Sequence, residues 1–362
     1  MTSSALFSPL TVGNTTFRNR LWVAPMCQYS CEDRDGVPTD WHLVNLGGMA
    51  RGGAGLVIAE ATAVVPEGRI SPWDTGIWND NQADAWARIV RFLHSQGSKA
   101  GIQLAHAGRK ASTYRSWSGR GAVPHSDGGW TPVGPSELPF RGLADPQPLS
   151  HEDIADIVTA FADAARRSAA AGFDVLEVHA AHGYLLHEFL SPASNDRTDE
   201  YGGSLENRAR FMLDVIRAVR EAAPSTTVFL RLSATDWIEP EGWTLEQTVE
   251  VSRWAREAGA DLIDISSGGN LPDARITVGP GYQVPFATAV KEGTGMPVAA
   301  VGLITEPHQA EHIVSAGQAD AVMAGREFLR DPHFPLRAAH ELGVDVDYWP
   351  LQYERGTFAD KP

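Results

Sequence analysis

Short apolar runs alternate with amphipathic helical patterns along most of the chain. The apolar runs are continuous rather than alternating, which is typical of parallel strands that are covered on both faces. Strict alternation of strands and helices predicts a parallel α/β fold. Eight such units favour a single closed (β/α)₈ barrel, a TIM barrel, over an open sheet. The predicted strands are 21–24, 56–60, 100–104, 175–179, 228–232, 262–266, 298–301 and 321–324.

The helical patterns have signals at their ends. Ser150 with Asp153 forms a capping-box pattern, and Gly172 stands where that helix should end. Thr244 and Thr305 are expected to cap two later helices. No Gly-x-Gly-x-x-Gly turn follows the first strand, which argues further against a Rossmann fold.

Two segments interrupt this alternation. Residues 111–149 and 267–285 are rich in turn-forming residues, lack helical periodicity, and follow the third and sixth strands. Loops at strand C-terminal ends lie on the active-site face of a barrel, and loops of this length are usually functional. Trp117 and Trp130 favour an ordered first segment that serves as a lid or pocket wall. We therefore expect one domain over 1–362, with extended loops after strands 3 and 6.

Composition and charge narrow the function classes. The formal net charge is −15 and charged residues make up 21%, which argues against nucleic-acid binding because that needs a basic surface. Cys27 and Cys31 are too few for a disulfide scaffold or an iron–sulfur cluster. The chain start lacks the pattern of a signal peptide, and no apolar stretch approaches about 18 residues. We expect a cytoplasmic protein without a membrane or nucleic-acid partner.

Polar and glycine residues stand at the C-terminal ends of the predicted strands, where a barrel places its chemistry. His179 and His182 are followed by Tyr184. The two histidines could ligate a metal, but carboxylates are sparse nearby, so we expect none. Two imidazole donors for one carbonyl oxygen, with Tyr184 as proton donor, is the favoured interpretation.

Two further polar residues lie within predicted strands. Gln103 either binds a neighbouring strand end or presents its amide to a ring with complementary edges. Arg231 either pairs with a carboxylate such as Asp264 or stands beside a cofactor that becomes anionic on reduction. The ends of strands 7 and 8 often bind phosphate in such barrels, and the residues there are Gly302, Gly325 and Arg326.

A family resemblance emerges from long segments spread over nearly the whole chain. Together they resemble the old yellow enzyme family, FMN-dependent ene-reductases with a (β/α)₈ fold. Cys27 and Tyr29, with the terminal Tyr-Glu-Arg-Gly, resemble the bacterial thermophilic-like subgroup. The segments that carry the likeness are 6–10, 179–187, 189–192, 195–208 and 352–356.

The resemblance implies a tightly but non-covalently bound FMN, with NADPH or NADH as hydride donor. It places Arg231 beside the pyrimidine edge of the flavin and Cys27 near its reactive part, where it would tune the potential. Gly302, Gly325 and Arg326 would hold the phosphate. The other implied FMN contacts are Ala24, Pro25, Met26, Ala61 and Gln103.

On the substrate side, the resemblance implies an α,β-unsaturated carbonyl or nitro compound. His179 and His182 would bind its oxygen while hydride reaches the β-carbon and Tyr184 gives a proton to the α-carbon. Tyr29 would line the pocket, and Lys110 would be a further flavin or pocket contact.

The resemblance also implies a homodimer or a dimer of dimers. The C-terminal tail, 343–362, would reach a neighbouring subunit, whose site Arg355 would complete. Segment 112–148 is longer and richer in Trp than the shortest subgroup members suggest. The form of the lid, and with it the substrate range, therefore stays open.

Two competing interpretations remain. A flavin-free lyase or aldolase would need a catalytic Lys or a metal at a strand end, and no predicted strand ends in Lys. A barrel that binds FMN without turnover would be expected to lack His179, His182 or Tyr184, and all three are present.

Overall fold

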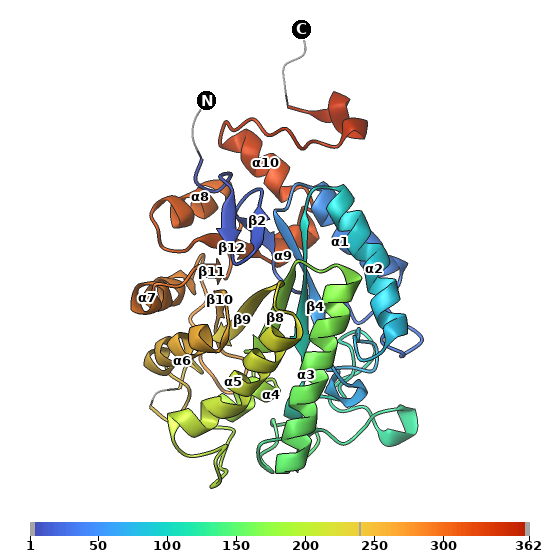
Figure 1. Ribbon diagram of the computed structural model, residues 1–362, viewed down its shortest axis with the longest axis vertical. Helices are drawn as coiled ribbons and strands as arrows, with labels where there is room; N and C mark the ends of the chain where they lie inside the picture. Colours follow the sequence, from blue (N-terminus) through green and yellow to red (C-terminus); the bar gives the residue numbers. More distant parts are fainter. Residues whose placement is uncertain (1–3, 239, 359–362) are drawn as a thin grey trace.

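The computed structural model describes residues 4–238 and 240–358. Eight parallel strands close into a barrel in the order β3-β4-β5-β8-β9-β10-β11-β12, and helices surround it (Figure 1). The predicted (β/α)₈ fold is confirmed. The barrel strands are β3 (Leu21–Val23), β4 (Leu56–Ala63), β5 (Lys99–Ala105), β8 (Val175–Ala180), β9 (Thr227–Ser233), β10 (Leu262–Ser266), β11 (Val298–Val301) and β12 (Ala321–Ala324).

The helices pack with their apolar faces on the barrel. In α3, Ile154, Ile157 and Phe161 are buried because they recur at helical spacing. The helices are α1 (Asp40–Arg51), α2 (Asp80–Ser95), α3 (His151–Ala171), α5 (Leu205–Ala222), α6 (Leu245–Ala258), α7 (Val284–Thr294), α8 (Pro307–Ser315) and α10 (Phe334–Glu341), with the short α4 (Leu185–Leu190) and α9 (Arg326–Arg330).

The predicted helix ends are mostly confirmed. Ser150 and Asp153 form a reciprocal capping box, and α3 ends at Gly172 in the left-handed conformation. The Thr244 side chain accepts a hydrogen bond at the start of α6. The cap predicted at Thr305 is wrong. The first turn of α8 begins at a proline after Glu306, and proline at that position needs no capped amide.

An N-terminal hairpin, β1 (Leu10–Val12) and β2 (Thr15–Phe17), closes one end of the barrel (Figure 1). Its Phe17 packs on Trp22 of β3, with ring centroids 4.5 Å apart, and Trp22 packs on Phe229 of β9 at 5.8 Å. Aromatic side chains therefore fill the interior where the strands begin.

The long loops lie at the opposite end of the barrel, as predicted. Segment 111–149 contains the short strands β6 (Val133–Gly134) and β7 (Gln147–Pro148), which pair in parallel. Within it, the Trp130 amide donates to Ser112 Oγ and the Trp130 indole to Glu67 O. The segment is thus an ordered wall anchored to the barrel.

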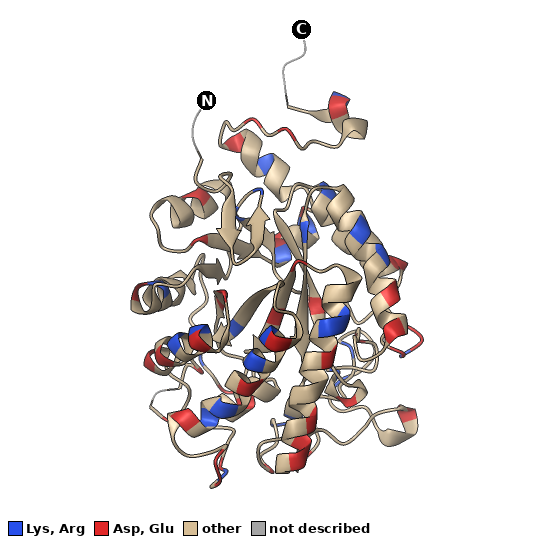
Figure 2. Cartoon of the chain, in the orientation of Figure 1, with Lys and Arg blue, Asp and Glu red and all other residues tan. Residues whose placement is uncertain are grey.

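The surface carries charges of both signs, and the C-terminal tail packs against the body of the protein. In the view of Figure 2, acidic and basic residues are interspersed along the outer helices. Within the described ranges, no helix combines the length and apolar character that crossing a bilayer requires. The 3-10 turn Leu351–Gly356 packs through Tyr353 against Arg51, at the end of α1, and against His333.

Candidate functional site

A cavity of about 290 Å³ opens where the barrel strands end. The strands β3, β4, β5, β8 and β9 supply its walls because their C-terminal ends meet at this face. Each of its lining residues was singled out from the sequence, so the fold brings these predicted residues together. They are Pro25, Cys27, Tyr29, Ala61, Gln103, His179, His182, Tyr184 and Arg231.

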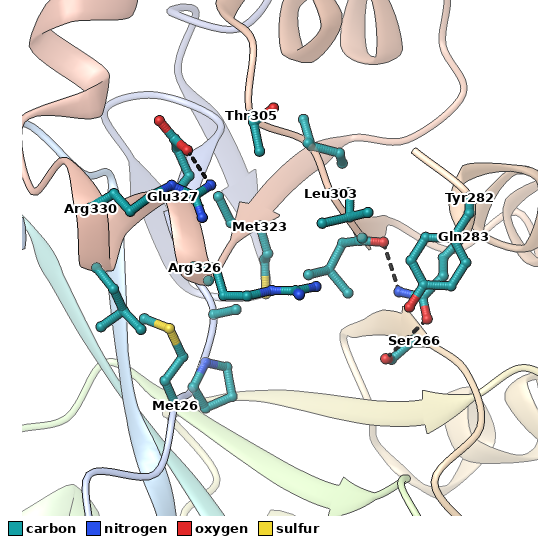
Figure 3. Close-up of a pocket in the computed structure, with 18 of the residues that line it drawn as sticks. Met26, Ser266, Tyr282, Gln283, Leu303, Thr305, Met323, Arg326, Glu327 and Arg330 are labelled. Atoms are coloured by element: carbon teal, nitrogen blue, oxygen red, sulfur yellow. Dashed lines mark hydrogen bonds and ion pairs between the residues drawn. The ribbon is translucent and has the colours of Figure 1, made fainter. Parts of the chain in front are cut away.

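A second pocket of about 300 Å³ continues from the first, because Pro25 and Arg231 line both. It lies over the ends of β11 and β12 and includes the remaining predicted cofactor contacts, namely Ala24, Met26, Gly302, Gly325 and Arg326. Figure 3 shows the Arg326 side chain extending across this pocket toward the wall that holds Gln283.

The second pocket has an unpaired cation and a glycine cradle. The Arg326 side chain makes no hydrogen bond or ion pair within the part of the chain that the structure describes. Gly302 has φ +127°, and a Cβ there would lie 2.9 Å from Gln283 Nε2. Gln283 is held in turn by Ser267 Oγ at 2.6 Å and Val301 O at 2.9 Å. The pocket thus presents a fixed wall and a free guanidinium to an anionic group.

The two histidines and Tyr184 form a cluster in the first cavity. The His179 ring centroid lies 5.2 Å from that of His182 and 5.0 Å from that of Tyr184. Nδ1 of His179 is buried without a partner among residues 4–238 and 240–358. Nε2 of His182 lies 2.7 Å from Ser266 Oγ, and its Nδ1 makes no hydrogen bond in the described chain. Free imidazole nitrogens therefore remain for a ligand.

Burial sets the protonation of this cluster. Burial, reinforced by Arg231, lowers the pKa of His179 and His182 well below the usual value, so both imidazoles are neutral at pH 7. Burial also raises the pKa of the Tyr184 phenol and of the Cys27 thiol. At neutral pH the two imidazoles, the phenol and the thiol are therefore all uncharged.

Gln103 and Arg231 lie on a polar floor beneath the cavity. Gln103 Nε2 donates to Glu177 Oε1 at 2.9 Å, and Arg231 Nε lies 3.1 Å from Asp264 Oδ2. Both residues thus have the partners on neighbouring strands that were considered from sequence, and both also line the cavity.

The structure places Lys110 behind the His182 turn rather than in the lining of either cavity. Its Nζ donates to His182 O at 2.8 Å and Gly269 O at 2.9 Å, and lies 4.9 Å from the Tyr184 ring centroid. Burial lowers the pKa of Lys110 to about 8, so it is charged at pH 7. Lys110 helps to hold His182 at its left-handed φ of +59°.

Comparison with known proteins identifies the family. Residues 5–345 match the model of the NADH:flavin oxidoreductase / NADH oxidase family. An NADPH dehydrogenase from Bacillus cytotoxicus is 49% identical over 354 residues, covering 98% of this chain and 97% of that protein. The chain belongs to the old yellow enzyme family.

Solved structures agree with this family. An old yellow enzyme homologue from Zymomonas mobilis has a TM-score of 0.79 and 28% identity, with 99% of both chains covered. A morphinone reductase has a TM-score of 0.78 and 29% identity, covering 95% of this chain and 91% of that one. This old yellow enzyme is an oxidoreductase whose cofactors are FMN and NAD(P)H.

The two joined pockets fit FMN. The first cavity suits a planar ring, because the Gln103 amide and the Arg231 guanidinium lie at its floor. The second offers the free Arg326 guanidinium and the Gly302 cradle to a phosphate. Connected ring and anion sites at the C-terminal ends of the strands are what a flavin mononucleotide needs.

Sequence reasoning missed several residues of this site. Ser266 and Ser233, which bind His182, follow no motif and come from other strands. The partnership of Glu177 with Gln103 depends on the register of β5 against β8, which the sequence does not show. The available signal was a carboxylate inside an otherwise apolar strand.

Arg355 is exposed and lies on the tail, which contacts the N-terminal end of the barrel. It is therefore remote from the cavity of its own chain, and its place in a neighbour's site stays a prediction. Cys27 and Cys31 are both free thiols.

Proposed function

We propose that this enzyme reduces the activated carbon–carbon double bond of α,β-unsaturated carbonyl or nitro compounds. The observation that supports this most is the cluster of His179, His182 and Tyr184 in one cavity, with neutral imidazoles and a protonated phenol. Such a cluster offers donors to an oxygen and a proton to carbon without any change of charge beforehand.

The histidines bind and polarise the substrate. His179 has an unpartnered nitrogen, and His182 has one nitrogen left beside its bond to Ser266. Hydrogen bonds to the substrate oxygen withdraw electron density and stabilise the negative charge that develops there. The β-carbon of the double bond thereby becomes a better hydride acceptor.

Tyr184 completes the reduction by giving its proton to the α-carbon. When bound, FMN supplies the hydride chemistry that links NAD(P)H to the β-carbon. One hydride and one proton together reduce the double bond by two electrons. The Lys110 ammonium, 4.9 Å from the ring centroid, stabilises the phenolate that Tyr184 leaves until solvent reprotonates it.

The roles of the FMN contacts follow the two pockets. We assign Arg326, Gly302 and Gly325 to the phosphate, and Gln103 and Arg231 to the ring. The remaining proposed contacts are Ala24, Pro25, Met26, Cys27 and Ala61.

The loop after β5 supports the substrate side. Arg115 Nη1 donates to Tyr29 O at 3.1 Å, and Tyr29 has the left-handed φ of +51°. The Trp117 ring packs edge-on against the Tyr29 ring, with the ring centroids 6.1 Å apart. This segment therefore positions Tyr29 as a pocket wall. The thermophilic-like subgroup, the cytoplasmic location and the homodimer or dimer of dimers, with Arg355 in a neighbour's site, remain predictions.

The test is an anaerobic absorption titration of the purified protein. Flavin bands should bleach with NADPH or NADH and return on addition of 2-cyclohexenone. Bands that bleach but never return with any enone or nitroalkene would refute the ene-reductase assignment. A protein that takes up no FMN would refute the proposed cofactor site itself.

A further inference from the structure

Four polar side chains form a continuous floor inside the barrel beneath the ring cavity. Gln103 of β5 is the register partner of Glu177 of β8, and Arg231 of β9 is the register partner of Asp264 of β10. Glu177 and Asp264 are completely buried, whereas Gln103 and Arg231 line the cavity above them. The two outer residues that face the cavity are thus each backed by a carboxyl group.

The two carboxyl groups lie against each other. Oε1 of Glu177 accepts from Gln103, and Oε2 has no donor in the described chain. Its neighbour is Asp264, whose two carboxyl oxygens are also buried without a hydrogen-bond partner in the described chain, so one proton held between the two groups would satisfy both. Two adjacent buried carboxylates repel strongly, so the pair holds one proton and one negative charge.

The surroundings decide where that proton rests. Asp264 has the Arg231 guanidinium at 3.1 Å, whereas Glu177 has only a neutral amide donor. Burial and the charge of Asp264 raise the pKa of Glu177 well above its usual value. Burial also raises the pKa of Asp264, but Arg231 opposes that shift. Asp264 is therefore the ionised member and Glu177 the protonated one.

We propose that Glu177 and Asp264 are positioning residues that share one proton, orient the Gln103 amide, and offset the charge of Arg231 toward the bound flavin. This rests on the FMN placement proposed above. With Glu177 holding Nε2, Gln103 presents its Oε1 to the cavity. With Asp264 beside it, Arg231 acts as half of an ion pair rather than as a lone cation.

The pair thereby sets the preference of the site for reduced over oxidised FMN. A flavin ring gains negative charge on reduction, and a nearby cation stabilises that charge in a poorly screened site. Asp264 weakens this effect of Arg231. Removing the single negative charge of the pair should therefore make reduced FMN bind more tightly relative to oxidised FMN.

The experiment compares three variants by the ratio of dissociation constants for oxidised and reduced FMN, measured through the reduction potential. Glu177→Gln keeps both hydrogen-bond roles of the protonated acid, so the ratio should stay within about threefold. The double variant E177Q/D264N removes the charge and prevents Glu177 from taking it over. Its ratio should shift at least tenfold toward reduced FMN, which is about 30 mV for a two-electron couple.

The matched control is Asp261→Asn. Asp261 pairs with Arg220 just before β10, at the opposite end of the same strand. This control removes an equal charge from an equal type of pair, and its ratio should stay within about threefold. A shift as large as that of the double variant would show a general charge effect and overturn the assignment.

Two further results would overturn the proposal. A tenfold shift in E177Q alone would mean that both carboxyls are ionised, and an unchanged ratio in a folded double variant would mean that the pair does not tune the site. If the double variant does not fold, the infrared band of a protonated carboxyl in the wild type decides. It should be present at pH 7 and reduced in E177Q.

The orientation of Gln103 has its own readout. Glu177→Met removes the acceptor, so binding of oxidised FMN should weaken, whereas E177Q should restore it. Wild-type protein that binds no FMN would refute the proposed function. If wild-type protein binds FMN but the ratio of dissociation constants is the same in all these variants, only this inference is refuted.

Discussion

The two ends of the barrel use charged residues in opposite ways. At the N-terminal end, Asp174, Asp261 and Asp320 stand immediately before β8, β10 and β12. Each accepts from an amide near the start of the neighbouring strand, at 2.8 or 2.9 Å. Each also binds a basic side chain, and the pairs are Asp174 with Lys99, Asp261 with Arg220 and Asp320 with Lys291.

At the C-terminal end, the corresponding groups are incompletely paired. His179 Nδ1, Glu177 Oε2 and Glu188 Oε2 are buried atoms that have no partner in the described chain. Unpaired buried polar groups cost stability, so these three atoms distinguish the C-terminal end from the fully paired carboxylates before β8, β10 and β12. We call the N-terminal end, where carboxylates join neighbouring strands, the structural end of the barrel. The C-terminal end, where the cavity lies, is the chemical end.

The largest expected effect comes from removing both histidine side chains from the chemical end. His179→Ala with His182→Ala should lower kcat/KM for 2-cyclohexenone roughly 10⁴-fold, because two oxygen-binding donors are lost. Binding of phenols, followed by the flavin spectrum, should disappear while FMN stays bound. Phenol binding of normal affinity would contradict the oxygen-binding assignment.

Tyr184→Phe should have the second-largest effect. Loss of the proton donor should slow reoxidation of the reduced enzyme by the enone roughly 10³-fold. Reduction by NADPH should be unchanged, and stopped-flow measurement of the two half-reactions separates them. An equal slowing of both would point to a distorted cavity instead.

Glu188→Gln tests the cost of a buried carboxyl at the chemical end. Burial raises the pKa of Glu188 to about 8, so the folded protein keeps a proton that the unfolded chain releases above about pH 4.3. Wild-type stability from this group therefore falls as the pH rises from about 4 to 8. Because the variant has no such carboxyl, its free energy of unfolding relative to that of the wild type should rise by about 3 kcal/mol between pH 5 and 7, as measured by urea unfolding. A pH-independent difference would contradict it.

Asp174→Ala tests the structural end, with the opposite sign. Burial raises the pKa of Asp174, but hydrogen bonds from His94, Ala100 and Lys99 outweigh it and lower the pKa overall. Its stabilisation is therefore present above about pH 4 and lost as the pH falls. The variant should lose about 2 kcal/mol at pH 7, less at pH 3, and keep its kcat. Asp174→Asn is the matched control for lost charge alone.

The smallest effect is expected from the tail, which joins the structural end of one barrel. Deleting residues from Gln352 onward should lower activity about threefold to tenfold by removing Arg355 from a neighbour's site, while FMN binding and stability persist. The substrate profile and the oligomeric state should be measured together. An unchanged profile would count against the neighbour-site prediction.

Much of this comparison was visible in the sequence. All eight barrel strands were predicted, with β4 extending three residues further because a bulge at 59–61 lets it continue to Ala63. The hairpin before β3 was not predicted, because its strands have three residues each and carry no periodicity. The cap at Thr305 was wrong because the proline two positions later begins the helix, which makes Glu306 the residue before its first turn.

The sequence by itself determined the barrel and the residues that meet at its C-terminal end. Continuous apolar runs that alternate with amphipathic helices can bury both faces only as a parallel sheet covered by those helices. Parallel strands bring their C-terminal ends together. Only the tertiary structure decided partners and protonation. Asp174 lies immediately before β8 and Glu177 lies three residues further on within it, yet Glu177 is held neutral and Asp174 ionised. Neighbouring strands and burial set that difference, and neither can be read from a linear chain.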